Sequence, residues 1–316
     1  MRACYHSAMP LLALKIDVDT LRGTREGVPN LVALLQRHHA DATFLFSLGP
    51  DHTGRAIKRA FRPGFFSKVS RTSVVEHYGV RTLLYGTLLP GPDIGARCAD
   101  VMRAVRDAGF EVGIHTWDHV KWQDHVMHED AAWARREMHL SVERFGEIFG
   151  TPAATHGAAG WQMSRDALRE TQRLGFDYCS DTRGRTPFIP VLNAEIVDCP
   201  QLPTTLPTLD EMIGIDGLTT ENVHERLLEL SRESPTDGHV FTLHAELEGM
   251  KLAPVFERLL EGWKAQGYTL VATRSLFERL DLSRLPYHEV EWREIAGRSG
   301  TLAVQGKEYL KVQETH

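Results

Sequence analysis

Apolar and polar residues alternate along most of the chain in two patterns, one typical of strands and one of helices. Leu11–Ile16 and Ala42–Leu48 are short apolar runs, whereas Val28–His39 has the spacing of an amphipathic helix with Pro29 in its first turn. The alternation continues through expected helices at Ala99–Ala108, Ala131–Phe149 and Leu252–Trp263 and expected strands at Glu111–His115, Val240–Leu243 and Tyr268–Ala272. This order predicts a parallel sheet with helices outside it, either open or closed as a barrel.

Two segments interrupt the alternation. Residues 49 to about 96 are rich in Arg, Phe and Gly, and residues 284 to 316 are polar. We expect the first to be an insertion after the second strand and the second to form short strands or a loose cap. The chain contains no internal repeat, so we expect one catalytic domain over residues 1–316 that carries both additions.

Composition narrows the class of protein. Of the 316 residues, 42% are hydrophobic and 25% are charged, which is typical of a globular protein with a sizeable core. The net charge of −6 argues against general affinity for nucleic acid. The 4 cysteines are scattered, which favours a reducing cytoplasm although they could still pair. We identify no signal peptide and no apolar run long enough to span a membrane.

Polar side chains follow several of the predicted strands. Asp17, Asp19, His115 and His244 all lie at or just after a strand end. Catalytic residues of parallel α/β folds gather at the carboxyl ends of the strands. We therefore expect these four side chains to share one site.

Asp17 and Asp19 are separated by one residue, and strand alternation places their carboxylates on the same side. Two like charges so close are unfavourable unless a cation or a shared proton offsets them. Taken alone, a solvated strand end explains the pair equally well.

His115 and His119 are four residues apart, a spacing that brings two imidazoles to one side if the chain turns helical after His115. Together with Asp19 they form a three-ligand set that leaves metal positions open for water and substrate, as in catalytic sites. Asp17 is then the candidate general base, and His244 the candidate general acid for a leaving amine. In isolation, His244 could equally be a capping residue.

Basic residues occur in two further places. Arg22 and Arg25 precede a predicted helix and could bind a phosphate or form a solvated loop. Between residues 54 and 75, six positive charges and no acidic residue alternate with phenylalanines. This stretch is either a solvated loop or an anchor on an anionic membrane surface, where each basic residue contributes about 1 kcal/mol. The expected contacts of the anchor are Arg59, Phe61, Arg62, Phe65, Phe66 and Lys68.

With D-V-D, H-T-W-D-H and F-T-L-H in this order, the chain resembles the polysaccharide deacetylase (NodB homology) superfamily. The resemblance implies a metal-dependent amide hydrolase on a distorted (β/α)7 barrel. Carried over by motif, Asp17 is the base, Asp19, His115 and His119 bind one divalent metal ion, and His244 is the acid. Zinc fits this ligand set best, and manganese, cobalt, nickel or iron also suit it.

The chain departs from the superfamily at its third motif, where an arginine usually steadies the base. Here the sequence reads HGAAG over residues 156–160. We expect Arg183 to orient Asp17 instead, or Asp181 to support His244. Glu246, two residues after His244, is a further candidate for substrate contact or support.

Several longer stretches, including IDVDTLRGTREGVP, HTWDHVKWQ, AAGW, SDTRG, LPTTLPTLDEMIG and LHAELEG, resemble the 4-deoxy-4-formamido-L-arabinose-phosphoundecaprenol deformylases. The resemblance implies release of formate from an undecaprenyl-phosphate-linked formamido sugar at the inner face of the bacterial inner membrane. The amine product would serve lipid A modification and polymyxin resistance. Met9 lies where such an enzyme would begin, so we expect residues 1–8 to be dispensable.

Three alternatives stay open from the sequence. Another carbohydrate N-deacetylase of the superfamily would share the motifs, and a non-haem iron oxygenase also uses two histidines and a carboxylate. A binding protein that has lost turnover is the third. The oligomeric state does not follow from the sequence.

Overall fold

A parallel sheet of seven strands forms the centre of the structure, a computed structural model that describes residues 9–56 and 79–310. The strands follow the order β5-β4-β3-β2-β1-β8, and β9 also pairs with β1. They are β1 (Leu11–Val18), β2 (Thr43–Ser47), β3 (Glu111–Thr116), β4 (Thr155–His156), β5 (Tyr178–Cys179), β8 (His239–His244) and β9 (Thr269–Val271). This parallel sheet confirms the predicted α/β class.

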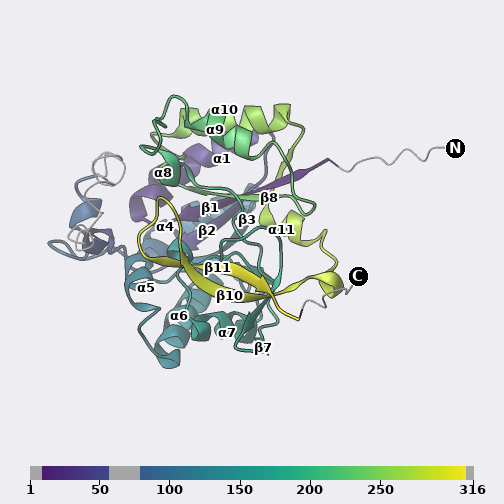
Figure 1. The fold of residues 1–316 in the computed structure, drawn as a ribbon. Helices are drawn as coiled ribbons and strands as arrows, with labels where there is room; N and C mark the ends of the chain where they lie inside the picture. Colours follow the sequence, from purple (N-terminus) through teal and green to yellow (C-terminus); the bar gives the residue numbers. More distant parts are fainter. Residues whose placement is uncertain (1–8, 57–78, 311–316) are drawn as a thin grey trace.

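Helices cover the outside of the sheet. Figure 1 shows α1, α9 and α10 grouped on one side of the strands and α5, α6 and α7 on the other. The helices are α1 (Val28–Arg37), α4 (Ile94–Asp107), α5 (His119–His125), α6 (Ala131–Phe149), α7 (Arg165–Leu174), α8 (Leu209–Met212), α9 (Val223–Leu230), α10 (Ala253–Ala265) and α11 (Thr273–Phe277), with shorter turns η1 (Gly23–Gly27), η3 (Thr82–Leu84), η4 (Ala159–Trp161) and η5 (Leu282–Arg284).

The strand β1 is buried along its whole length, as a central strand with helices on both faces must be. β2 pairs with it from Lys15 onward and β8 pairs with it from Leu12 to Asp17. β9 pairs with Leu11–Ala13, before the pairing with β2 begins. β1 therefore connects both halves of the sheet and carries Asp17 near its carboxyl end.

An irregular segment, rather than a regular strand, lies between β5 and β8. In it the Leu202 N–H donates to the Cys179 carbonyl at 2.8 Å, and the Thr205 N–H donates to the Val240 carbonyl at 3.0 Å. This segment contacts both β5 and β8, the strands at the two ends of the strand order. The barrel is distorted at this segment, as the resemblance implied.

A second sheet of four strands, in the order β11-β10-β6-β7, packs against the barrel. The hairpin of β10 and β11 lies across the front of the molecule in Figure 1. The Arg183 N–H donates to the Ala303 carbonyl at 2.9 Å, and the Trp292 indole donates to the Met163 carbonyl at 2.7 Å. The described part of the polar tail thus forms strands. The strands of this sheet are β6 (Ile189–Leu192), β7 (Glu195–Ile196), β10 (Tyr287–Glu294) and β11 (Thr301–Glu308).

Most predicted elements are present, with small shifts at their ends. The largest shift is at α4, which begins at Ile94 and not at Ala99. Asp93 caps this helix, because its Oδ1 accepts the Ala96 N–H at 2.8 Å. The predicted insertion therefore ends before residue 96.

The predicted membrane contacts Arg59, Phe61, Arg62, Phe65, Phe66 and Lys68 lie outside the described residues, as do residues 1–8. The surface anchor and the dispensable N-terminus both stay predictions. Within the described part of the chain, every helix is too short or too polar to cross a bilayer.

Candidate metal and catalytic site

Asp19, His115 and His119 come together just beyond the ends of β1 and β3. Asp19 Oδ1 lies 3.2 Å from His115 Nε2 and 3.4 Å from His119 Nε2. The chain turns helical after His115 because Asp118 caps α5, accepting the Lys121 N–H at 3.1 Å. His119 is the first residue of that helix, so the four-residue spacing brings both rings to one side.

The tautomer of His115 is set by its backbone neighbour. A carbonyl oxygen can only accept, so Nδ1 donates its hydrogen to the Gly157 oxygen, 2.6 Å away. The lone pair of Nε2 then faces Asp19. Both His115 Nε2 and Asp19 Oδ1 are buried and make no hydrogen bond within the described part of the chain, although they are 3.2 Å apart. Two acceptors facing each other in this way suit a cation between them.

The charges around Asp19 favour its ionised form. Burial alone would raise the pKa of Asp19, but the nearby His119 and His115 imidazoles hold it well below its ordinary value. For His115 burial would lower the pKa, but Asp17 and Asp19 raise it above the ordinary value. The donor set of one carboxylate and two imidazoles fits a divalent metal ion. That Asp19, His115 and His119 bind a metal ion stays a prediction.

Glu246 supports the turn that carries Asp19. Its Oε1 accepts three hydrogen bonds, from the Asp19 N–H at 3.1 Å and from the Thr20 N–H and hydroxyl, each at 2.8 Å. Burial, and then the charge of Asp19, raise the pKa of Glu246 well above its ordinary value. The structure therefore places Glu246 behind Asp19, consistent with the support role considered for it.

Asp17 is 2% exposed and has two unlike oxygens. Oδ2 lies 3.3 Å from the Lys15 ammonium, whereas Oδ1 lies 3.8 Å from His115 Nδ1 and has no hydrogen-bond partner among the described residues. One oxygen is thus held by a cation, and the other remains able to accept a proton.

The predicted orienting role of Arg183 is wrong. Its Nη1 contacts Glu211 Oε1 at 2.6 Å and its Nη2 donates to the Leu206 carbonyl at 3.1 Å. The guanidinium is therefore engaged with the loop before α8, and Lys15 occupies the position beside Asp17. The sequence signal for Lys15 was a lysine in an otherwise apolar strand.

The structure also does not place Asp181 against His244. Asp181 Oδ1 accepts from His156 Nδ1 at 2.7 Å and from the Ala158 N–H at 2.8 Å, and Oδ2 accepts from the Gln201 amide at 3.3 Å. Both oxygens are occupied within the core, where Asp181 holds the segment that contains Gly157. Asp181 therefore acts on the site only through that segment.

His244 ends β8 directly beside Asp17, with which it is in register. Its backbone N–H donates to Glu248 Oε2 at 2.8 Å, while His244 Nδ1 and Glu248 Oε1 are both buried and have no hydrogen-bond partner in residues 9–56 and 79–310. Burial raises the pKa of Glu248 to about 7, although the His244 imidazole opposes this rise. Sequence reasoning missed Glu248, four residues after His244.

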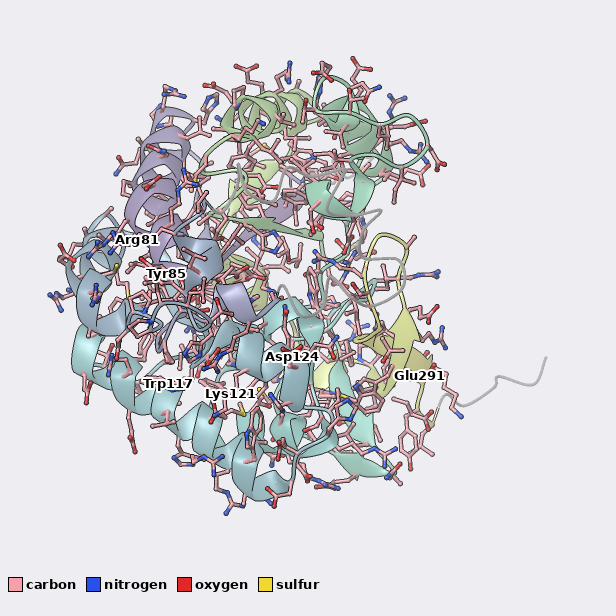
Figure 2. The ribbon with its side chains drawn as sticks, turned by 90° about the vertical axis from the view of Figure 1, so that its left-hand side faces the viewer. Arg81, Tyr85, Trp117, Lys121, Asp124 and Glu291 are labelled. Atoms are coloured by element: carbon pink, nitrogen blue, oxygen red, sulfur yellow. The ribbon has the colours of Figure 1, made fainter. Side chains whose placement is uncertain are left out.

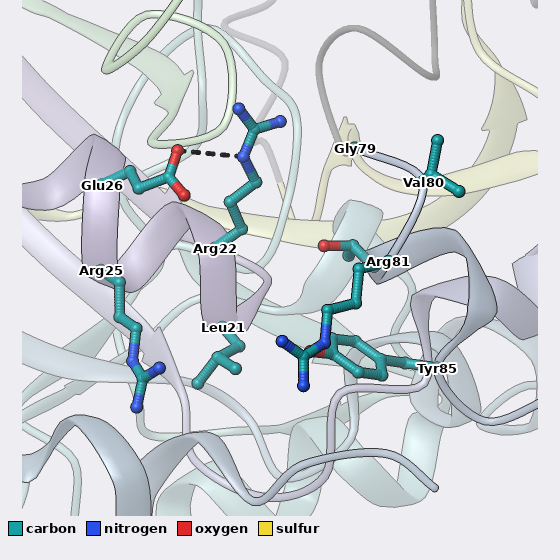
Figure 3. Close-up of a pocket in the computed structure, with 9 residues that line it drawn as sticks. Leu21, Arg22, Arg25, Glu26, Gly79, Val80, Arg81 and Tyr85 are labelled. Atoms are coloured by element: carbon teal, nitrogen blue, oxygen red, sulfur yellow. Dashed lines mark hydrogen bonds and ion pairs between the residues drawn. The ribbon is translucent and has the colours of Figure 1, made fainter. Parts of the chain in front are cut away.

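A cavity of about 310 Å³ opens beside the turn after Asp19. Figure 3 shows Arg22 and Glu26 paired across 3.0 Å on its wall and the Arg81 guanidinium next to the Tyr85 ring. Figure 2 places Arg81 and Tyr85 together at the same side of the molecule. With Arg25, the lining holds three arginines and one glutamate, so its net charge is positive.

Comparison with known proteins places these features in a family. Residues 10–179 match the family model described as polysaccharide deacetylase. A protein of Shewanella sediminis named "Probable 4-deoxy-4-formamido-L-arabinose-phosphoundecaprenol deformylase ArnD" is 39% identical over 93% of this chain and 94% of its own length. A protein of the same name from Wigglesworthia glossinidia brevipalpis is 31% identical over 90% and 99%. The fold is similar to the crystal structure of a candidate polysaccharide deacetylase from Mycobacterium smegmatis (TM-score 0.61, 15% identity, covering 92% and 96% of the two chains).

Proposed function

Because the chain belongs to the polysaccharide deacetylase family, we propose that it is a metal-dependent deformylase of an undecaprenyl-phosphate-linked 4-deoxy-4-formamido-L-arabinose. The reaction consumes water and gives formate and the 4-amino sugar. On this proposal the amine serves lipid A modification and polymyxin resistance, and the enzyme works at the inner face of the inner membrane.

The observation that carries the proposal is the placement of three kinds of group at one end of the sheet. Asp19, His115 and His119 converge on a point that suits a divalent cation. Asp17 and His244 are neighbours on β1 and β8 at the same level. A metal-dependent amide hydrolase uses these three functions: a Lewis acid, a base for water and an acid for the leaving amine.

Asp19, His115 and His119 would hold the metal ion, which supplies Lewis acidity towards the formamide oxygen and the attacking water. Asp17 accepts a proton from that water at Oδ1, the oxygen that lacks a hydrogen-bond partner. The hydroxide so formed bonds to the formyl carbon, and His244 gives a proton to the departing 4-amino nitrogen as the C–N bond breaks. Zinc fits the donor set best, with manganese, cobalt, nickel or iron as alternatives.

The formyl substrate tests the proposal directly. We expect the metal-loaded protein to release formate from the formamido lipid, and to act much more slowly on the acetamido analogue. Formate is measured enzymatically, with oxygen consumption recorded alongside. Hydrolysis of the acetyl analogue alone would make the protein another carbohydrate N-deacetylase. Oxygen uptake coupled to turnover would make it an oxygenase.

We further propose that the arginine-lined cavity receives the phosphate of the substrate. Arg22 follows Asp19 by three residues, so their Cα atoms lie within about 11 Å of each other. A pyranose carries its 1-phosphate and its 4-formamide only a few bonds apart, so the phosphate must lie close to the metal site. The positive lining of the neighbouring cavity suits that group.

Replacement of Arg81 by alanine is therefore expected to raise KM for the lipid phosphate about tenfold, the loss of one charge-assisted hydrogen bond. On a formamido sugar without phosphate the same variant should match the wild type. Arg37→Ala is the matched control, because Arg37 is an exposed arginine paired with Glu257 on α1. Equal losses on both substrates would show that Arg81 does not contact the phosphate.

A further inference from the structure

Lys15 is a fully buried lysine in the central strand of the sheet, with an exposed fraction of 0%. It lies in β1, paired with Thr43 of β2 and Thr242 of β8. Lysine is almost never fully buried unless its charge is paired, because removing an ammonium from water costs several kcal/mol. The groups that contact the Lys15 ammonium therefore indicate why a lysine occupies this position.

Three groups surround the ammonium. Nζ lies 3.3 Å from Asp17 Oδ2, donates to the Ser180 carbonyl at 3.1 Å, and lies 5.2 Å from the centre of the Trp161 ring. The carboxylate pairs with the charge, the carbonyl accepts a hydrogen bond, and the indole face attracts a cation. Lys15 and Asp17 are two residues apart on one strand, so their side chains lie on the same face.

Residues 156–160, where the superfamily usually has an arginine, leave space for the Lys15 side chain. A Cβ on Gly157 would lie 2.8 Å from Lys15 Cε and 2.4 Å from Leu45 Cδ1, so a larger residue there would displace these side chains. Trp161 has a φ of 53°, a left-handed conformation that is strained for a bulky residue. The indole of Trp161 donates to Thr204 Oγ1 at 3.2 Å, which fixes the ring beneath the ammonium.

The other cations near Trp161 are engaged elsewhere. The guanidinium groups of Arg183 and Arg298 lie 4.8 and 4.9 Å from the ring centre, and both contact Glu211 Oε1, at 2.6 and 2.7 Å. Among the described residues, Lys15 is the cation paired with Asp17 Oδ2.

We propose that Lys15 is the positioning residue of Asp17, supplied by the first strand together with Gly157 and Trp161. The ammonium fixes Oδ2, and Oδ1 is thereby held towards the space between His115 and His244. This inference rests on the proposed role of Asp17 as the base. Lys15 acts through Asp17 and does not itself contact the reacting atoms.

Lys15→Met should remove the cation with little change in side-chain volume. We expect kcat to fall about 10²-fold, the scale of a misplaced catalytic group, with KM and metal content little changed. Lys15→Arg, which keeps the charge, should recover part of the lost kcat. If Lys15→Met does not fold, Lys15→Gln replaces it, because its amide can still donate to the Ser180 carbonyl.

Arg274→Met is the control for loss of a partly exposed ion pair away from the candidate site. Arg274 contacts Asp177 Oδ2 at 2.8 Å and lies 5.7 Å from the Tyr178 ring centre, beside Glu111 at the opposite end of β3. We expect this variant to lose thermal stability and to keep its kcat. An equal fall of kcat in both variants, or a Lys15→Met enzyme with wild-type kcat, would overturn the proposal.

A second measurement does not depend on the substrate. Crystal structures of wild type and Lys15→Met, both loaded with zinc, should show the Asp17 carboxylate rotated in the variant and Asp19, His115 and His119 unmoved. An Asp17 carboxylate in the same position without Lys15 would contradict the inference. Failure of the wild type to release formate would count against the proposed function only.

Discussion

His119→Ala is expected to leave a folded protein without bound metal and without activity, whereas Asp17→Asn is expected to keep the metal and still lose turnover. The two residues lie within one site but would have different tasks. His119 Nε2 faces Asp19 Oδ1 at 3.4 Å, where a ligand is needed. Asp17 instead has one oxygen paired with Lys15 and one without a partner. An asparagine at position 17 has the same shape but cannot serve as a base, so kcat should fall by about 10² to 10⁴-fold.

Elemental analysis after dialysis, with kcat measured on the same samples, separates the two effects. Asp19→Ala and His115→Ala should behave like His119→Ala, because all three donor atoms lie within 4.8 Å of one another. His125→Ala is the control, since His125 is a largely exposed histidine at the other end of α5. Full metal content in His119→Ala would remove His119 from the ligand set.

The fold and the meeting of Asp17, Asp19, His115 and His244 could be predicted because both depend on local pattern. Apolar runs mark the strands, and the parallel order brings their carboxyl ends to one edge. The structure places His244 in register with Asp17. The order of the apolar runs therefore predicts which of the polar residues at strand ends lie near one another.

Partners that depend on packing could not be predicted in the same way. The stretch SDTRG offers Arg183 as a candidate partner of Asp17, yet this arginine contacts Glu211. Lys15 was overlooked because a lysine in the run Leu11–Ile16 gives no sign of whether it reaches solvent or turns inward. That choice depends on the space left beside Gly157, which directly follows β4 and is distant from Lys15 in sequence.

The start of α4 and the support of His244 differ in how far the sequence reveals them. Asp93 could have been identified as an N-cap, since aspartate before a helix is a local signal. Glu248 could not be assigned from its position alone. Its contact with the His244 N–H depends on the turn that follows β8.

Loss of the His244 imidazole should cause the second large fall in kcat. An amine is a poor leaving group unless its nitrogen is protonated, and His244 lies at the end of β8 in register with Asp17. Glu248 holds the His244 backbone through its Oε2, and the imidazole is free to face the site because Nδ1 has no hydrogen-bond partner. We therefore expect this side chain to protonate the leaving nitrogen.

His244→Ala is expected to lower kcat on the formamide by about 10² to 10⁴-fold, the usual contribution of general acid catalysis, with KM little changed. The loss should be smaller on a 4-O-formyl ester, because an alkoxide leaves without prior protonation more readily than an amide nitrogen does. Metal content should stay full, which separates this variant from the ligand variants. His288→Ala is the control, since the Nδ1 of that histidine donates to the Gly306 carbonyl in the second sheet. Equal losses on the formamide and the ester would mean that His244 binds or orients the substrate, and unchanged turnover would mean that its contact with Glu248 only holds the turn after β8.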